Sequence, residues 1–253
     1  TGAVAVQSMT SANIISTVFV GGLTNARSDN LDAVVTQTAR LKADSIGISS
    51  KRLVMNVDNL AVETVGDVYL QELDSVALSE TFFDGSAVKV GGDFDLLALG
   101  AGTNTITISQ KVLLTGGNDI RIAAGNDIVV TGPGGQIDGS GDVTLGSVFD
   151  TRINAGALVK AANKIVVRVD TDLTAENITG GTFELRGAME ALTIELYGNA
   201  AKDTFLIDAE NIDGNVTVKM GSDEDLFTLN ELHERDANET FLIDGQAGSD
   251  EYI

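Results

Sequence analysis

The chain has 253 residues, 43% of them hydrophobic, and carries a formal net charge of −21 at pH 7. This hydrophobic fraction excludes a disordered chain, and the acidic charge opposes binding to nucleic acid or to an anionic membrane surface. The sequence contains no cysteine, which excludes disulfides, thiolate catalysis and cysteine zinc sites. Divalent cations held by oxygen ligands are the ions that such a chain attracts.

Short runs of β-forming residues follow one another along the chain and are separated by Gly, Asn or Asp. Most of them alternate β-branched and polar residues, which is the pattern of strands with one buried face. The clearest runs are Leu53–Val57, Asp67–Leu70, Ala87–Val90, Asn104–Ile108, Asp127–Val130, Asp142–Leu145 and Lys164–Val169.

One segment, Leu31–Leu41, also fits a helical stripe. Val34 and Val35 are poor helix formers because their branched Cβ atoms crowd the preceding turn. We therefore expect a strand in this segment as well.

The separators repeat too, since Gly-Asp or Gly-Asn-Asp precedes five of the strands. Similar short strands with turn signals at this density predict a parallel β-helix, an all-β solenoid, in which each strand stacks on its equivalent one coil away. An antiparallel β-sandwich is the alternative. The Asp-Gly pairs that would form its hairpins are few and far apart: Asp84-Gly85, Asp138-Gly139, Asp213-Gly214 and Asp244-Gly245.

A family resemblance appears in the segment that contains Leu41–Gly47, Val57–Leu60 and Gly66–Leu70, and again at Gly116–Val130. These stretches resemble the β-helical repeats of large filamentous-haemagglutinin-type bacterial exoproteins. The resemblance implies a right-handed, elongated β-helix with an adhesive or structural role. It also implies a secreted, extracellular or cell-surface location in bacteria.

Three related turns occur after residue 180, each with glycine, then an Asp, one spacer and an aromatic residue. The three Asp residues, Asp203, Asp225 and Asp250, lie 22 and then 25 positions apart. Because that spacing suits one coil, we expect the three turns to stack on one edge. Residues 198–253 hold 14 Asp and Glu against 3 Lys and Arg, so this acidic segment carries −11 of the charge.

These turns resemble the calcium-binding glycine- and aspartate-rich repeats of hemolysin-type (RTX-like) proteins. The resemblance implies bound Ca²⁺, which takes six to eight oxygen ligands in flexible geometry. The spacing is longer than in that family, and glycine is replaced at Ala201 and Asp223. The candidate ligand residues are Gly198, Asn199, Asp203, Gly221, Asp223, Asp225, Gly245, Gly248 and Asp250.

The alternative for the same turns is local hydrogen bonding, in which each Asp carboxylate accepts backbone N–H groups. Asp225 and Asp250 are the strongest metal candidates, because Lys202 beside Asp203 is able to take the place of a cation. Asn118-Asp119 and Asn126-Asp127 pose the same choice between a calcium turn and a stacked corner.

Catalytic motifs are missing from the sequence. His233 is the only histidine and lies in a polar stretch, and there is no nucleophile elbow, P-loop or dinucleotide fingerprint. A polysaccharide lyase is the enzyme alternative, but Trp is 0 and aromatic residues are 5%, which argues against sugar-stacking subsites. We therefore do not expect an enzyme.

The sequence predicts coils over residues 1–175 that continue into acidic coils over residues 176–253. We expect no transmembrane helix, because no run of about 18 apolar residues occurs. The chain has no signal peptide and stops within the repeat pattern, which we interpret as a segment of a longer surface protein. We expect a calcium-stabilised adhesive or structural module with a glycan or cell-surface target. The alternative is a fibre or sheath subunit that self-associates head to tail.

Overall fold

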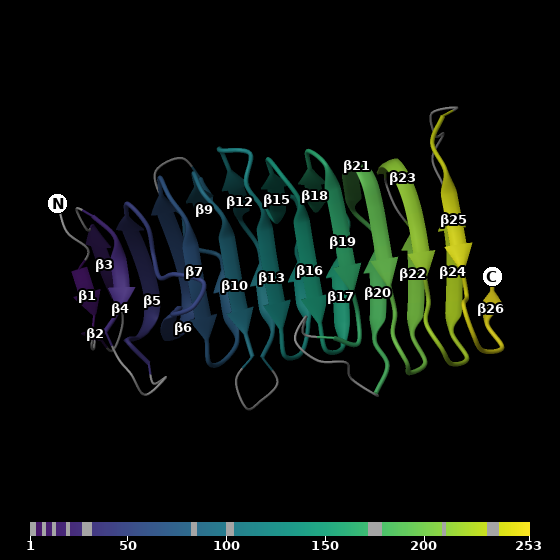
Figure 1. Cartoon of the computed structure of the whole chain (residues 1–253), viewed down its shortest axis with the longest axis horizontal. Coiled ribbons are helices and arrows are strands. Elements are labelled where there is room, and N and C mark those ends of the chain that lie inside the picture. Colours follow the sequence, from purple (N-terminus) through teal and green to yellow (C-terminus); the bar gives the residue numbers. More distant parts are fainter. Residues whose placement is uncertain are drawn as a thin grey trace.

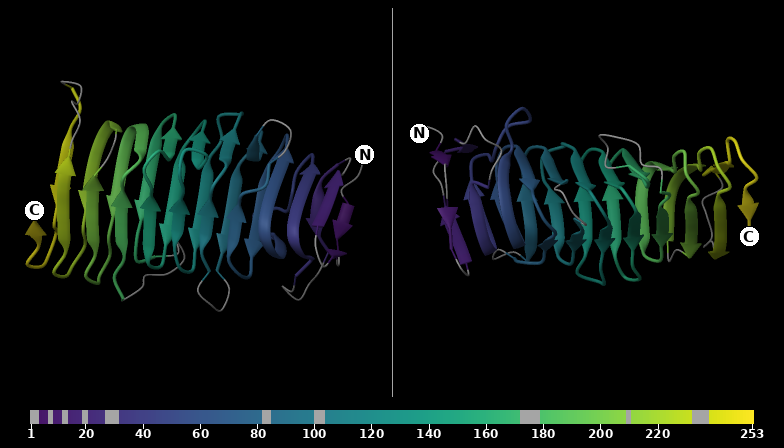
Figure 2. Two further views of the ribbon diagram at one scale, coloured as in Figure 1. Left: turned by 180° about the vertical axis from the view of Figure 1, so that it is seen from behind. Right: turned by 90° about the horizontal axis from the view of Figure 1, so that it is seen from below.

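The computed structural model describes residues 4–6, 9–11, 14–18, 21–26, 32–81, 85–99, 104–171, 179–208, 211–231 and 238–253. Over these residues the chain forms no helix, and strands wind into one elongated β-solenoid of about 9 turns. Successive coils follow one another along the long axis, and the two termini lie at opposite ends (Figures 1 and 2). The predicted all-β parallel solenoid is confirmed. The named strands of the described residues pair in parallel, which excludes the antiparallel sandwich.

Each regular coil has three walls, which we call faces A, B and C in the order in which the chain passes them. Face A contains β7 (Val68–Glu72), β10 (Phe94–Ala98), β13 (Ile120–Ala124), β16 (Val143–Ser147), β19 (Lys164–Arg168) and β25 (Phe241–Asp244). Face B contains β8 (Val76–Leu78), β11 (Ile106–Ile108), β14 (Ile128–Val130), β17 (Asp150–Ile153), β20 (Thr182–Leu185), β22 (Thr204–Asp208), β24 (Leu226–Glu231) and β26 (Glu251–Tyr252). Face C contains β9 (Ser86–Val90), β12 (Lys111–Leu114), β15 (Gln136–Gly139) and β18 (Leu158–Ala161).

Some strands run across a corner without a break. β21 (Ala188–Tyr197) and β23 (Asn211–Lys219) cover face C and then face A. β6 (Leu53–Thr64) pairs with β7, β8 and β9 in turn and so crosses all three faces. The N-terminal coils contain β1 (Val4–Val6), β2 (Met9–Thr10), β3 (Ile14–Val18), β4 (Leu23–Asn25) and β5 (Val34–Ala43).

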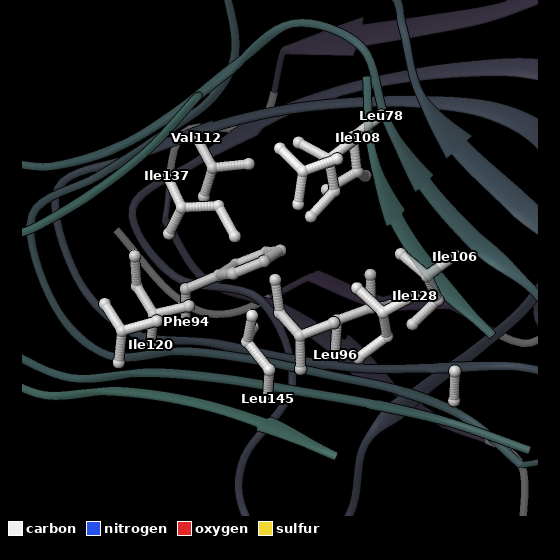
Figure 3. Packing of buried hydrophobic residues seen from close by; sticks show 14 of the residues in the cluster. Leu78, Phe94, Leu96, Ile106, Ile108, Val112, Ile120, Ile128, Ile137 and Leu145 are labelled. Carbon is white, nitrogen blue, oxygen red and sulfur yellow. The ribbon is translucent and has the colours of Figure 1, made fainter. Parts of the chain in front are cut away.

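The core is a set of columns that run parallel to the long axis. Because side chains alternate along a strand and the ladders are in register, an inward residue stacks on the inward residue of the next coil. One column of face A joins Val68 to Phe94, Ile120, Val143 and Ile165. Figure 3 shows apolar side chains from the three walls meeting in the interior, where water is excluded. Burial of these columns is the main stabilising contribution.

The Gly-Asp separators form one corner of the solenoid, just before face A. Asp67, Asp93, Asp119 and Asp142 lie one above the other, and the carboxylates of the first three accept the N–H of the Asp in the next coil at 3.0, 3.2 and 2.8 Å. A Cβ atom on Gly92 would lie 2.1 Å from Asp67 Oδ1, and one on Gly141 would lie 2.5 Å from Asp119 Oδ1. Glycine precedes Asp93 and Asp142 because the carboxylate of the preceding coil occupies the space of a side chain.

Charged residues of opposite sign face each other between coils on the outer surface. Lys42 pairs with Glu63 at 2.6 Å, and Lys160 pairs with Glu190 at 2.6 Å, both on face C. On face A, Asp95 lies between Arg52 and Arg121 at 2.5 and 3.2 Å. On face A, a further pair of this kind joins Lys164 and Glu195 at 3.2 Å.

The strands expected from the sequence are confirmed, including the Val34–Ala43 strand in the segment that also fitted a helix. Leu31 itself lies outside the described residues. The sheet passes from the first predicted segment to the second without a break, because β17 pairs with β20 and β19 pairs with β21. Residues 172–178, near the expected boundary, lie outside the described residues.

Replacing Phe205 by Ala should be costly, because its ring is 1% exposed and stacks 6.4 Å from that of Phe183 in an inward column of face B. We expect the free energy of unfolding to fall by about 3–5 kcal/mol. Leu206→Ala is the matched control on the same strand, where the side chain points outward, and should cost within about 1 kcal/mol. Urea unfolding of both variants measures the difference, and equal costs would contradict the inward column.

Candidate functional site

The three acidic turns stack on one edge of the solenoid, as the sequence predicted. Asp203, Asp225 and Asp250 directly precede β22, β24 and β26, whose first residues pair with one another in register. We call Asp203, Asp225 and Asp250 the aspartate column. Backbone hydrogen bonds link the same positions, from Leu226 N–H to Asp203 O at 3.0 Å and from Glu251 N–H to Asp225 O at 2.8 Å.

Asp203 and Asp225, the first two residues of the aspartate column, point into the solenoid. Asp203 is two residues before the buried Phe205, so alternation along the strand puts both side chains on the inner side. The same relation holds for Asp225 and Phe227. Asp203 is 0% exposed and Asp225 is 1% exposed, whereas Asp250 in the last coil is half-buried.

Backbone N–H groups of neighbouring turns occupy most of the carboxylate oxygens. Asp203 Oδ1 accepts the N–H of Gly181 at 2.7 Å, and its Oδ2 accepts the N–H of Asn199 at 2.6 Å. Asp225 Oδ1 accepts the N–H of Asp203 at 2.7 Å, and Asp250 Oδ1 accepts the N–H of Asp225 at 3.2 Å. Asp225 Oδ2 is buried and has no hydrogen-bond partner among the described residues. Each coil is therefore tied to the previous one by a carboxylate.

Burial shifts the titration of these carboxyls. Burial raises the pKa of Asp203 to about 7, and the neighbouring carboxylates of Asp170 and Asp225 act in the same direction, against the N–H groups that lower it. Burial, followed by the carboxylates of Asp250 and Asp223, raises the pKa of Asp225 to about 6. Asp203 and Asp225 therefore retain protons in a pH range where exposed carboxyls have lost them.

Only some of the glycines in the three turns are level with one another. The ladders align Tyr197 with Lys219 and Lys219 with Asp244, so Gly198 is level with Met220 and Gly245. Gly221 is therefore level with Asn199. Gly248 packs on the carbonyl of Asp223, because a Cβ atom there would lie 1.7 Å from Asp223 O. The three Asp residues are aligned from coil to coil, whereas the glycines around them are not all aligned.

These positions do not assemble a calcium shell as they are arranged. Four of the six carboxylate oxygens of the aspartate column already accept backbone N–H groups, which leaves Asp225 Oδ2 and Asp250 Oδ2 against the six to eight oxygens that Ca²⁺ takes. No group of three or more acidic or histidine side chains within the described residues is placed to hold a metal ion. The geometry favours the hydrogen-bonding alternative, and calcium binding stays a prediction.

Two buried carboxyls were not predicted from the sequence. Asp170 is 0% exposed, has a φ of 63° and lies close enough to Asp203 to raise the pKa of that residue. Glu72 is 0% exposed at the end of β7. The alternation of buried side chains along β7 would have identified Glu72 as buried, because Glu72 follows the inward Val68 and Leu70 at steps of two. Asp170 gave no such signal, because its left-handed backbone breaks the alternation.

The other sequence candidates are separated by the fold. Asp119 lies at the corner before face A and Asp127 at the corner before face B, so the two Asn-Asp pairs belong to different edges. Asp127 Oδ1 accepts the N–H of Asp150 at 3.2 Å, as a stacked corner does. His233 lies outside the described residues.

A groove of about 320 Å³ lies at the corner between faces C and A. Two ammonium groups and two carboxylates in its lining balance formally, and Val65 presents a 78% exposed apolar side chain. The groove therefore combines hydrogen-bond donors and acceptors with an apolar side chain, and its lining holds no aromatic residue. The lining residues are Lys42, Ala43, Asp44, Glu63, Thr64, Val65, Lys89, Gly91 and Thr115.

The aspartate column should make stability depend on pH. The folded state binds protons more tightly than the unfolded state, because the pKa of Asp203 is raised from 3.8 to about 7. The contribution of Asp203 to the free energy of unfolding should therefore fall as pH rises from about 4 to about 7 and level off above that. Urea unfolding across this range measures the slope.

Asp203→Asn should flatten that slope. It should also lower stability at every pH, because an amide nitrogen cannot accept the second N–H. Asp93→Asn, in the outward corner, is the control that should keep the wild-type slope. An unchanged slope in Asp203→Asn would contradict the assignment.

Comparisons with known proteins add no family to this geometry. No family model matches the chain, and no curated protein and no solved structure matches it either. Within the described part of the chain there is also no helix of the length and apolarity needed to cross a membrane.

Proposed function

We propose that the chain is a structural β-solenoid module of a larger bacterial surface protein, where it acts as a stiff spacer that carries an adhesive surface. The observation that carries this proposal is the continuity of the ladders. Inward columns and hydrogen-bonded corners run from the N-terminal coils to the last coil, so each coil is held by the one before it.

The outer surface supports the same proposal. Paired charges between coils and the −11 charge of residues 198–253 keep a long β-structure soluble and discourage lateral pairing of strands. The groove at the corner between faces C and A offers hydrogen-bond donors and acceptors with an apolar side chain on that surface. A glycan or another cell-surface molecule is the target class that we propose for the adhesive role.

A spacer that bears tension should release its coils one at a time when pulled from the two ends. From β7 onward, residues that pair on face A lie 22 to 29 positions apart, as in the pairing of Val143 with Ile165 and of Ile165 with Ile194. Each release should lengthen the chain by roughly 70–105 Å, at about 3.3–3.6 Å for each residue. Single-molecule force spectroscopy measures these steps, and a single unfolding event for the whole chain would count against the spacer.

The same preparation tests the fibre alternative. Filaments in electron micrographs of the purified chain alone would favour a self-assembling subunit, whereas single particles would favour the module.

Calcium stabilisation of the last coils is the second part of the proposal, and it is supported by the charge of residues 198–253 and by the open Asp225 Oδ2. Calcium at about 100 times its dissociation constant should stabilise the folded state by about 2.7 kcal/mol and raise the melting temperature relative to a chelator. Asp225→Asn should abolish the rise, and Asp93→Asn should retain it. Identical wild-type melts with calcium and with chelator would remove this part and leave the structural proposal intact.

A further inference from the structure

Glu72 fills a gap in the ladder between β6 and the next coil. Met55 pairs with Glu72 and Asn59 pairs with Ala77, so four steps along β6 are matched by five along the coil that contains β7 and β8. One residue is therefore extra at this corner, as in a β-bulge, and an inner N–H of β6 loses its strand partner. That N–H belongs to Val57, which is 1% exposed.

The Glu72 carboxyl supplies the missing acceptor. Val57 N–H lies 3.2 Å from both Oε1 and Oε2, and the corner residues Leu73 and Asp74 donate to Oε1 at 3.0 and 3.4 Å. A buried N–H without an acceptor would cost about as much as a lost hydrogen bond. The side chain of Glu72 therefore replaces the strand carbonyl that the extra residue removes.

Within the part of the chain that the structure describes, no cation is among the groups that shift the pKa of Glu72. The residue is 0% exposed, its partner in β6 is Met55, and its partner in β10 is Ala98. The charged groups around it are acidic: Asp32, which precedes β5, raises its pKa, and Asp74 lies in the corner itself. Burial of an uncompensated carboxylate is costly, so the neutral acid is the stable form inside.

We propose that Glu72 is a proton-controlled latch that joins β6 to β7 and β8 while it is neutral and loosens this corner when it ionises. The joint lies where the uninterrupted β6 meets the first three-walled coil (Figure 1). Loss of the proton would weaken the hold of the N-terminal coils on the rest of the solenoid. This inference does not depend on the adhesive function or on calcium.

The direction of the pH effect follows from proton linkage. Burial, the largest cause, raises the pKa of Glu72 from 4.5 to about 8, in spite of the N–H groups of Val57, Leu73 and Asp74. An opening that exposes Glu72 to water releases its proton anywhere between these two values. The opening equilibrium should therefore rise about tenfold for each pH unit up to about pH 8 and level off above it.

Amide hydrogen exchange of Val57 and Leu73 tests the latch in the whole chain. After correction for intrinsic exchange rates, we expect protection of these two amides to fall about tenfold for each unit between pH 6 and 8 and then to level off. Glu72→Gln should remove this pH dependence, because its amide oxygen accepts the same N–H groups and cannot ionise. Glu63→Gln on the outer side of β6 should leave the wild-type profile unchanged.

A direct titration keeps the proposal falsifiable if the variant fails to fold. The carboxyl carbon of Glu72 in the wild-type chain should titrate in NMR spectra with a midpoint near 8. A midpoint below about 6 would overturn the latch, because the residue would then be ionised at neutral pH without effect. The same exchange profile in wild type and Glu72→Gln would overturn it as well.

Discussion

Register-matched parallel stacking is the constraint on which the rest of this molecule depends. Coils lie about 4.8 Å apart, so whatever stands at one position meets its counterpart in the next coil at that distance. For apolar residues this is favourable, and the columns that begin at Val68 and Leu70 continue through coil after coil. For ionised groups it is unfavourable, since equal charges at about 5 Å repel. The arrangement of charge in the solenoid follows from this conflict.

The solenoid limits the repulsion between stacked charges in three ways. Along faces A and C, opposite charges alternate between coils, as in Arg52, Asp95 and Arg121. At the corner before face A, equal charges do stack, but each carboxylate accepts an N–H from the next coil and stays at the surface. In the aspartate column, Asp203 and Asp225 turn inward, where burial holds their protons. The first two solutions allow a long acidic rod at any pH above the carboxyl range, whereas the third makes the stability of the last coils depend on pH.

The sequence was sufficient to predict the strands and corners, because these depend on local chemistry. Alternating runs such as Lys164–Val169 predicted strands, and Gly-Asp pairs predicted corners, because both signals arise within a few residues. It also predicted that Asp203, Asp225 and Asp250 share an edge. It did not predict how residues align between coils, where Gly198 is level with Met220 and not with Gly221. Alignment depends on how many residues each corner absorbs, and that is settled by the whole stack.

For these acidic residues, the sequence nevertheless shows on which side of the wall the carboxyl lies. The signal is parity, that is, whether the residue numbers of the acid and of a neighbouring apolar residue are both odd or both even. Asp203 and Phe205 share a parity, as do Asp225 and Phe227, and as do Leu70 and Glu72; all six side chains are buried. Asp93 and Asp95 have the opposite parity to Phe94 and Leu96 and remain nearer the surface. Because a one-residue shift moves a side chain to the other face, parity separates acids that cap a corner from acids that must give up their charge. The inward acids lie where the regular wall is interrupted, at the bulge beside β6 and at the turns before face B, and there their carboxyls replace acceptors that a regular ladder would supply.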